Sequence, residues 1–167
     1  MQNSPTKTFG EFLVRTIERM RPSVLRDSFG RGVDDCLLER TWQMEWYRTA
    51  RTAAPEESTI SPDVGYVFGS DGFLDFYVDG DYGWGVELMR EGKRLGDHAK
   101  RFEQGGQYEV IPMNDWAILD FRHHFKRVRN LMPNFWYVLY SDDYKQVTIV
   151  RHDKEDRVLR LIGDDFK

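Results

Sequence analysis

Hydrophobic residues recur at helical spacing in two segments near the N-terminus. The first pattern predicts a helix over residues 8–21, whose apolar side chains share one face: Phe9, Phe12, Leu13, Ile17 and Met20. Thr8 and Glu11 fit a capping box at its start, and Pro22 is expected to close it. The second pattern predicts a helix over residues 33–53 with an apolar stripe of Val33, Leu37, Trp42, Trp46 and Ala50. It ends before the proline-containing linker AAPEESTISP.

Short apolar segments separated by turn residues follow these helices. They predict three strands, DVGYVF, FLDFYV and WGVELM, at residues 63–68, 73–78 and 84–89. The glycine- and aspartate-rich turns between them are typical of antiparallel hairpins. A helix over residues 93–104 is expected next, with Leu95, Ala99 and Phe102 inward and Gly105 and Gly106 at its end.

The C-terminal third of the chain predicts further strands. DWAILDF, at residues 115–121, is apolar on both faces, as in a central strand covered on both sides. NFWYVLYS and KQVTIVR predict a strand pair at residues 134–141 and 145–151, joined by the turn at Asp142 and Asp143. The pattern of RVLRLI, at residues 157–162, leaves its type open. The order helix, three-strand antiparallel meander, helix and strand predicts an α/β fold.

Length and composition limit the classes of protein to which this chain can belong. A chain of 167 residues suits one domain, divided here into an N-terminal helical extension (1–32), a core (33–122) and C-terminal strands (123–167). No apolar run approaches the roughly 18 residues of a membrane span, so we expect a soluble protein with no membrane partner. Charged residues interrupt the N-terminus, which therefore shows no signal peptide. The single cysteine, Cys36, excludes an internal disulfide and is expected to be buried in a helix.

The charge balance argues against a protein that coats duplex DNA, because the net charge is -4. Two segments are nevertheless basic: Lys93, Arg94, Lys100 and Arg101, and Arg122, His123, His124, Lys126, Arg127 and Arg129. They are either local phosphate-binding patches or solvated faces. The spacing of the histidines at 123, 124 and 152 to nearby acids indicates no metal site, and no role is assigned to them.

The second and third predicted strands each carry one carboxylate. Alternation divides FLDFYV into two faces, Leu74, Phe76 and Val78 against Phe73, Asp75 and Tyr77. In WGVELM, Glu87 points away from Val86 and Leu88. If the strands pair, Asp75 and Glu87 lie side by side, and a divalent cation such as Mg²⁺ would relieve their repulsion. The alternative is that each carboxylate meets an arginine or faces water.

This order of elements and acids is similar to the PD-(D/E)xK restriction-endonuclease-like core. More narrowly, SPDVGYVFGSDGFLDFYV, WGVELMREGKRLGDHAKRF, QGGQYEV and AILDFR resemble the nuclease-type C-terminal domain of Crinkler effector proteins, over about residues 37–122. The resemblance implies a nuclease that uses Mg²⁺ or Mn²⁺ to hydrolyse DNA. It also implies a secreted effector acting in the host nucleus.

Matched residue by residue, the resemblance makes Asp75 and Glu87 the motif acids and metal ligands. It makes Glu45, on the second predicted helix, a further acid aimed at the metal, with Glu39 as the competing choice. The motif lysine is replaced by Met89, which can neither orient water nor neutralise charge.

Cations near the third strand are the predicted substitutes for that lysine. Lys93, past the turn at Gly92, is the first choice and Arg90 the second. His98, within DHAKRF, is expected to contact the scissile phosphate or transfer a proton, the alternative being a satisfied core histidine. Nucleic-acid contacts are expected from five residues: Arg90, Lys93, Arg94, Arg101 and Arg122.

Two other functions stay open at this stage. Met89 and the acidic net charge favour a module that keeps the fold, has lost catalysis and binds a host protein or nucleic acid. A phosphoesterase acting on RNA or a small nucleotide is the third possibility.

Overall fold

The computed structural model describes residues 8–28, 39–65, 68–70, 72–92, 94–126 and 128–166. Its helices are α1 (Phe9–Glu18), α2 (Pro22–Ser28), α3 (Glu39–Ala53) and α4 (Leu95–Lys100), with a final 3-10 turn, η2 (Gly163–Phe166). Its strands are β1 (Ile60–Val64), β2 (Leu74–Val78), β3 (Trp84–Arg90), β4 (Asp115–His123), β5 (Phe135–Tyr140), β6 (Gln146–Arg151) and β7 (Arg157–Arg160). The predicted α/β class is confirmed.

All of these strands form one mixed sheet, in which their spatial order follows the chain. Neighbouring strands are antiparallel from β1 to β3 and from β5 to β7. The β3–β4 and β4–β5 pairs are parallel, and the chain passes through α4 on its way from β3 to β4. The carboxyl ends of β3, β4 and β5 therefore meet at one edge of the sheet.

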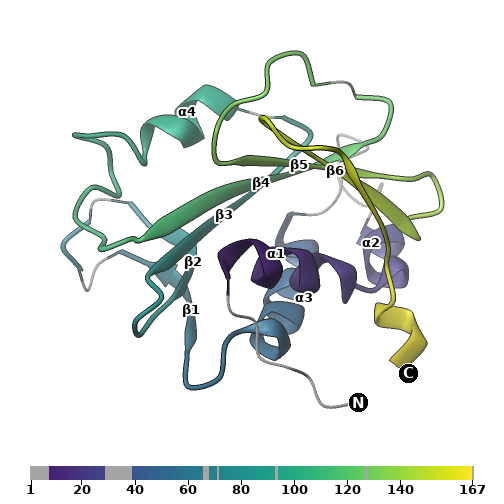
Figure 1. Ribbon diagram of the computed structural model, residues 1–167, viewed down its shortest axis with the longest axis horizontal. Helices are drawn as coiled ribbons and strands as arrows, with labels where there is room; N and C mark the ends of the chain where they lie inside the picture. The colour runs from purple at the N-terminus through teal and green to yellow at the C-terminus, as the bar shows by residue number, and fades with distance from the viewer. Residues whose placement is uncertain are drawn as a thin grey trace.

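The larger core lies between the sheet and α1, α2 and α3, which cover one face (Figure 1). Thr8 caps α1 as predicted, since its Oγ1 accepts a hydrogen bond from the Glu11 N–H at 3.2 Å. Two indoles of α3 reach the sheet. Trp42 packs against Phe121 with tilted rings whose centroids are 4.5 Å apart, and Trp46 packs against Phe76 in the same way at 4.9 Å. Contacts of this kind explain the high aromatic content.

The opposite face of the sheet is covered by α4 and by the loops on either side of β4 (Figure 1). Leu95, Ala99 and Phe102 pack inward there, as predicted. Met89 lies in the same apolar cluster with 3% of its surface exposed. The residue at the motif lysine position is therefore a core side chain.

Several element boundaries differ from the prediction. Pro22 begins α2 rather than only ending α1, because the fixed φ of proline suits the first residue of a helix. α4 spans six residues instead of twelve, and RVLRLI contributes β7. The predicted helical positions Val33, Cys36 and Leu37 lie outside the described residues.

The first strand lies earlier than predicted, at Ile60–Val64 rather than 63–68. Asp63 has a positive φ of 50°, which interrupts the regular strand. Just after it, Gly65 packs so closely on Gly72 that an added Cβ would lie 2.1 Å from the Gly72 carbonyl oxygen. The chain therefore leaves the sheet where the sequence pattern predicted its continuation.

This irregularity also changes the start of β2. The prediction that Leu74 shares a face with Phe76 and Val78 is wrong, because Leu74 packs with Tyr77 and Tyr108 on the α4 side. The β1–β2 ladder pairs Val64 with Leu74 and Pro62 with Phe76, and no pairing of Asp63 with Asp75 is present between them. Strand alternation assumed a regular pleat that this segment lacks.

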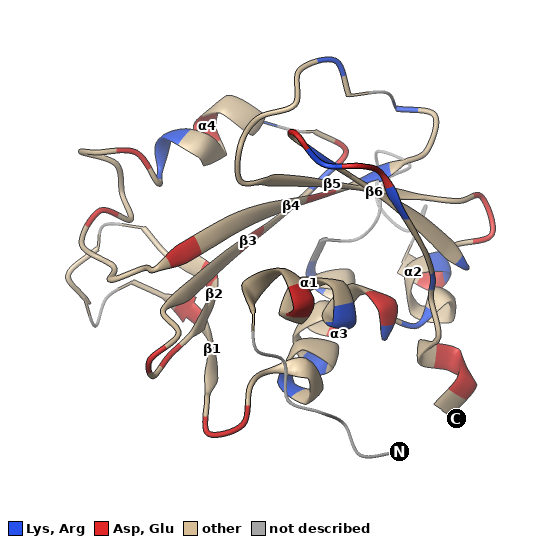
Figure 2. Ribbon diagram, viewed as in Figure 1, with Lys and Arg blue, Asp and Glu red and all other residues tan. Residues whose placement is uncertain are grey.

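Charged residues of both signs are interspersed along the described chain (Figure 2). None of the helices in the described residues has the length and apolar character needed to cross a bilayer.

Candidate functional site

The Glu87 carboxylate lies in the middle of β3 on the α4 side, with 2% of the residue exposed. Its Oε1 is 2.7 Å from His98 Nδ1 and 2.5 Å from Arg101 Nη1. The Tyr108 hydroxyl lies 3.5 Å from the same oxygen. Because α4 and the turn after it supply His98 and Arg101, this carboxylate also holds that segment on the sheet.

The second carboxylate oxygen of Glu87, Oε2, differs from Oε1 in its hydrogen bonding. Glu87 Oε2 is buried and has no hydrogen-bond partner among the described residues. A buried acceptor without a partner costs about 1–3 kcal/mol, and more when it is charged. A bound cation would relieve this cost, so the carboxylate fits the metal ligand that its position in the sequence implied.

Asp75 stands at the neighbouring position on β2. The β2–β3 ladder begins at the pair of Phe76 with Val86, one residue short of Asp75 and Glu87. The Leu88 N–H donates a hydrogen bond to Asp75 Oδ2 at 2.8 Å. The Asp75 carboxylate therefore contacts the β3 backbone one residue after Glu87, through a side-chain hydrogen bond, and the side-by-side placement of the two carboxylates stays a prediction.

The negative charges of both carboxylates affect the Tyr108 hydroxyl. Its hydroxyl donates to the Phe73 carbonyl oxygen at 2.8 Å. Burial raises the pKa of Tyr108 well above its ordinary value, and the negative charges of Glu87 and then Asp75 raise it further. Both acids are therefore within electrostatic reach of one hydroxyl.

Arg101 stays charged in this environment. Burial, the largest single influence, would lower the pKa of its guanidinium, but the Glu87 charge, the interactions with Tyr108 and the hydrogen bond to Glu87 together raise that pKa. About a third of the Arg101 side chain is exposed, against 18% for His98. The site therefore presents one permanent cation and one imidazole toward solvent beside the two acids.

Glu45 is not brought to this site. Its side chain accepts hydrogen bonds from the Arg21 N–H at 2.8 Å, from the Arg21 guanidinium at 2.8 Å and from the Arg48 guanidinium at 2.7 Å. Burial alone would raise the pKa of Glu45, but the bonds from Arg48 and Arg21 lower it overall. Glu45 is therefore committed to a structural ion-pair cluster that joins α3 to the start of α2.

The rotation of α3 explains why Glu45 faces away from Asp75. Asp75 lines a small pocket of about 110 Å³ together with Arg40, Met44 and Tyr47 of α3. At about 100° per residue, Glu45 lies roughly 130° around the helix from that face. The other helical acid considered, Glu39, has its side chain outside the described part of the structure.

The remaining predicted cations are dispersed. Lys93 lies outside the described residues. Arg90 ends β3 and is half-buried, while Arg94 is exposed in a left-handed conformation (φ 58°) before α4. Among the described members of the five predicted nucleic-acid contacts, Arg101 forms an ion pair with Glu87. Arg122 has a different role.

Arg122 forms an ion pair with Asp120 that is buried. Its Nε lies 2.5 Å from Asp120 Oδ2, and its guanidinium stacks 5.4 Å from the Tyr137 ring centroid. Asp120 is fully buried in β4, and burial raises its pKa in spite of the bonds from Arg122 and from the Gly92 N–H. The predicted DNA contact by Arg122 is therefore replaced by pairing within the protein. The available signal was the second aspartate of DWAILDF, an acid inside an otherwise apolar strand.

Comparison of the chain with protein-family models, with curated proteins and with solved structures found no match. The resemblance to PD-(D/E)xK nucleases therefore rests on the quoted segments and on the order of elements. Function has to be inferred from the chemistry of the site, which combines two neighbouring carboxylates, an arginine, a histidine and a tyrosine.

Proposed function

We propose that the chain is a divalent-metal-dependent phosphodiesterase that cleaves nucleic acid, DNA first and RNA second, with Asp75 and Glu87 as its metal ligands. The observation that carries the proposal is the buried Glu87 Oε2, which has no partner among the described residues, while the Asp75 carboxylate is bonded to the next residue of β3 through the Leu88 N–H. The order α3, β1–β3, α4, β4, with β4 parallel to β3, agrees with the order of elements in the PD-(D/E)xK core.

Bound Mg²⁺ or Mn²⁺ would polarise a phosphoryl oxygen and make water a stronger nucleophile. Arg101 binds the substrate phosphate, because its partly exposed guanidinium can exchange the Glu87 oxygen for phosphate oxygens. His98 holds a proton on Nδ1 toward Glu87 Oε1, which leaves its Nε2 to exchange a proton with the reacting phosphate. Tyr108 keeps its proton and orients the loop beside Glu87.

A second candidate, a non-catalytic binding module, is favoured by two specific observations. Met89 is buried in an apolar cluster, so the usual lysine is absent from that position. Arg101 and His98 already neutralise one oxygen of Glu87, which lowers the demand for a cation. This candidate predicts no divalent-ion binding that depends on Asp75 and Glu87.

The test measures cleavage of plasmid DNA and labelled RNA with Mg²⁺ or Mn²⁺, alongside calorimetric binding of Mn²⁺. Asp75→Asn and Glu87→Gln are each expected to reduce cleavage and Mn²⁺ affinity by at least about 100-fold, as loss of a ligand should exceed loss of an outer-shell partner. Asp81→Asn, in the exposed β2–β3 turn, is the matched control and should change neither. Thermal melting confirms that each variant is folded.

Three outcomes separate the candidates. Full cleavage by a folded Asp75→Asn or Glu87→Gln variant would overturn the assignment of the site. Carboxylate-dependent Mn²⁺ binding without cleavage of either substrate would remove the phosphodiesterase and leave a metal-binding protein. Absence of Mn²⁺ binding in the wild type would favour the non-catalytic module.

A further inference from the structure

A second group of metal-ligand side chains lies at the edge where the parallel strands end. His123 is the last residue of β4, His124 follows it, and Asp142 lies in the turn after β5. His123 pairs with Tyr140 in the β4–β5 ladder, and the His124 N–H donates to the Tyr140 carbonyl oxygen at 3.0 Å. Ligands commonly bind at this edge of sheets with parallel strands.

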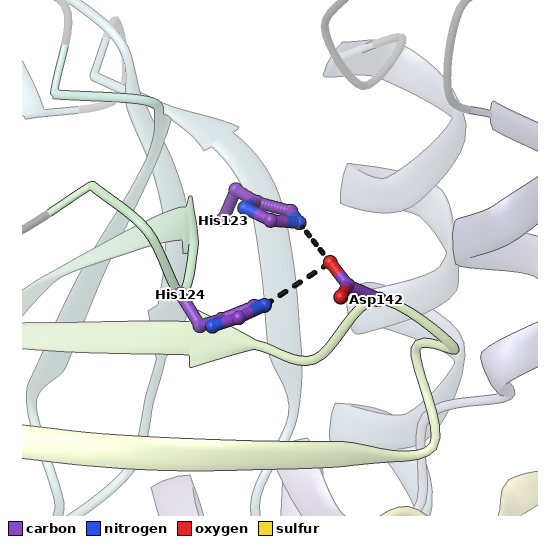
Figure 3. A group of neighbouring side chains, drawn as sticks. All are labelled: His123, His124 and Asp142. Carbon is purple, nitrogen blue, oxygen red and sulfur yellow. Dashed lines mark hydrogen bonds and ion pairs between the residues drawn. The ribbon is translucent and has the colours of Figure 1, made fainter.

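The three side chains converge on one point (Figure 3). His123 Nε2 lies 2.7 Å and His124 Nε2 3.0 Å from the same oxygen, Asp142 Oδ1. Metal bonds of about 2.0–2.1 Å in tetrahedral geometry separate ligand atoms by about 3.3 Å. A cation therefore requires the side chains to move apart by only a few tenths of an ångström.

Neighbouring contacts hold these side chains in place. The two imidazole rings have centroids 4.5 Å apart, and the Phe125 ring lies 4.0 Å from that of His124. In the β5–β6 turn it is Asp143 that accepts hydrogen bonds from Ser141 Oγ and the Lys145 N–H. These hydrogen bonds, which close the turn, do not involve the Asp142 carboxylate, and that carboxylate is directed at the imidazoles.

The site opens onto a pocket of about 710 Å³. His124 and Asp142 line it, together with Lys145, Gln146 and Thr148. A site with three protein ligands that faces such a space leaves a coordination position for water or for an exogenous ligand, as catalytic zinc sites do.

We propose that His123, His124 and Asp142 form a binding site for a first-row transition-metal ion, of which Zn²⁺ is the best match. Imidazole ligands favour such ions, whereas Mg²⁺ prefers oxygen ligands alone. Both histidines would bind as neutral imidazoles through Nε2, with the ring proton on Nδ1. In His123 the proton therefore moves from Nε2 to Nδ1, which gives up the long, 3.4 Å hydrogen bond from the Phe125 N–H. The site is independent of the proposed carboxylate site.

The test uses tag-free protein, titrated with Zn²⁺ by calorimetry and with Co²⁺ by visible absorption. We expect one Zn²⁺ per chain and a Co²⁺ spectrum with ligand-field bands. His124→Ala should weaken Zn²⁺ binding by at least about 100-fold and abolish the Co²⁺ bands, because it removes a ligand rather than an outer-shell group. Asp142→Asn, at a side chain that is 70% exposed, should weaken both signals.

Two controls make the result specific. His152 also lies beside an aspartate, with Nδ1 3.1 Å from Asp153 Oδ2, but its pair has no second imidazole. His152→Ala should therefore leave Zn²⁺ binding unchanged, and so should Glu87→Gln. Absence of Zn²⁺ binding, or undiminished binding in folded His124→Ala and Asp142→Asn variants, would overturn the proposal without affecting the proposed phosphodiesterase site.

Discussion

Replacement of Glu45 by glutamine tests the structural role that the fold assigns to this residue. The Glu45 side chain is 1% exposed and receives charged hydrogen bonds from Arg21 and Arg48. Glutamine has nearly the same volume but presents an N–H donor to one of these guanidinium groups, where the carboxylate presents an acceptor. The substitution therefore removes charge and pairing while leaving the packing of α3 almost unchanged.

The size of the effect follows from the exposure of the partners. Breaking a fully buried ion pair costs about 3–5 kcal/mol. The Arg21 and Arg48 side chains are 35% and 45% exposed, so water can solvate them after the change. We therefore expect a loss of about 2 kcal/mol, discounted for this solvation. For a chain of this size, that loss lowers Tm by about 4–8 °C.

The pH dependence of the Tm difference supplies a second check. The pKa of Glu45 is lowered in the folded protein relative to its ordinary value of 4.5. Its stabilisation is therefore present above pH 4.5 and is lost as the pH falls through the lower folded value. Calorimetric melting should show a gap between wild type and Glu45→Gln that is full at neutral pH and shrinks in acid. An unchanged Tm at neutral pH, or a gap that grows on acidification, would refute the reasoning.

Three further substitutions probe the fold by urea unfolding. Arg122→Met leaves the buried Asp120 without its ion-pair partner, so we expect the free energy of unfolding to fall by about 3–5 kcal/mol. A fall of less than about 1 kcal/mol would contradict the ion pair. Phe12→Ala, at a fully buried ring of α1, should lower the free energy of unfolding by about 3–5 kcal/mol, because it leaves a cavity. An almost unchanged free energy of unfolding would mean that α1 does not pack on the sheet. Tyr108→Phe should cost about 1 kcal/mol because it deletes the hydrogen bond to the Phe73 carbonyl, and an unchanged stability would argue against that bond.

The candidate carboxylate site could be predicted in part because its central residues are close in sequence. Asp75 and Glu87 lie on strands joined by a short turn, so the predicted hairpin was enough to bring Asp75 to the β3 backbone at the Leu88 N–H, next to Glu87 in the sequence. His98 faces the sheet as helical spacing indicated, and its contact is Glu87 itself. Glu45 could not be placed in the same way, because the rotation of α3 depends on how Trp42 and Trp46 pack against the sheet.

The group formed by His123, His124 and Asp142, in contrast, could not be predicted from the sequence. Spacing along the chain gave it no recognisable motif, since eighteen residues separate Asp142 from His124. Its geometry comes from the parallel pairing of β4 with β5, which brings the two strand ends to one edge. For the ion pair of Asp120 and Arg122 the sequence offered only the acid inside an apolar strand, because its burial depends on the covering of the α4 face.

The sequence by itself determined the α/β class, most of the strands and the hairpin of β2 and β3, because these depend on hydrophobic periodicity and short turns that act over a few residues. The tertiary structure decided which charges are paired, which helix face meets the sheet and which strand ends converge. Those outcomes depend on burial and register between distant segments, where one residue of slippage or a quarter turn of a helix changes every contact.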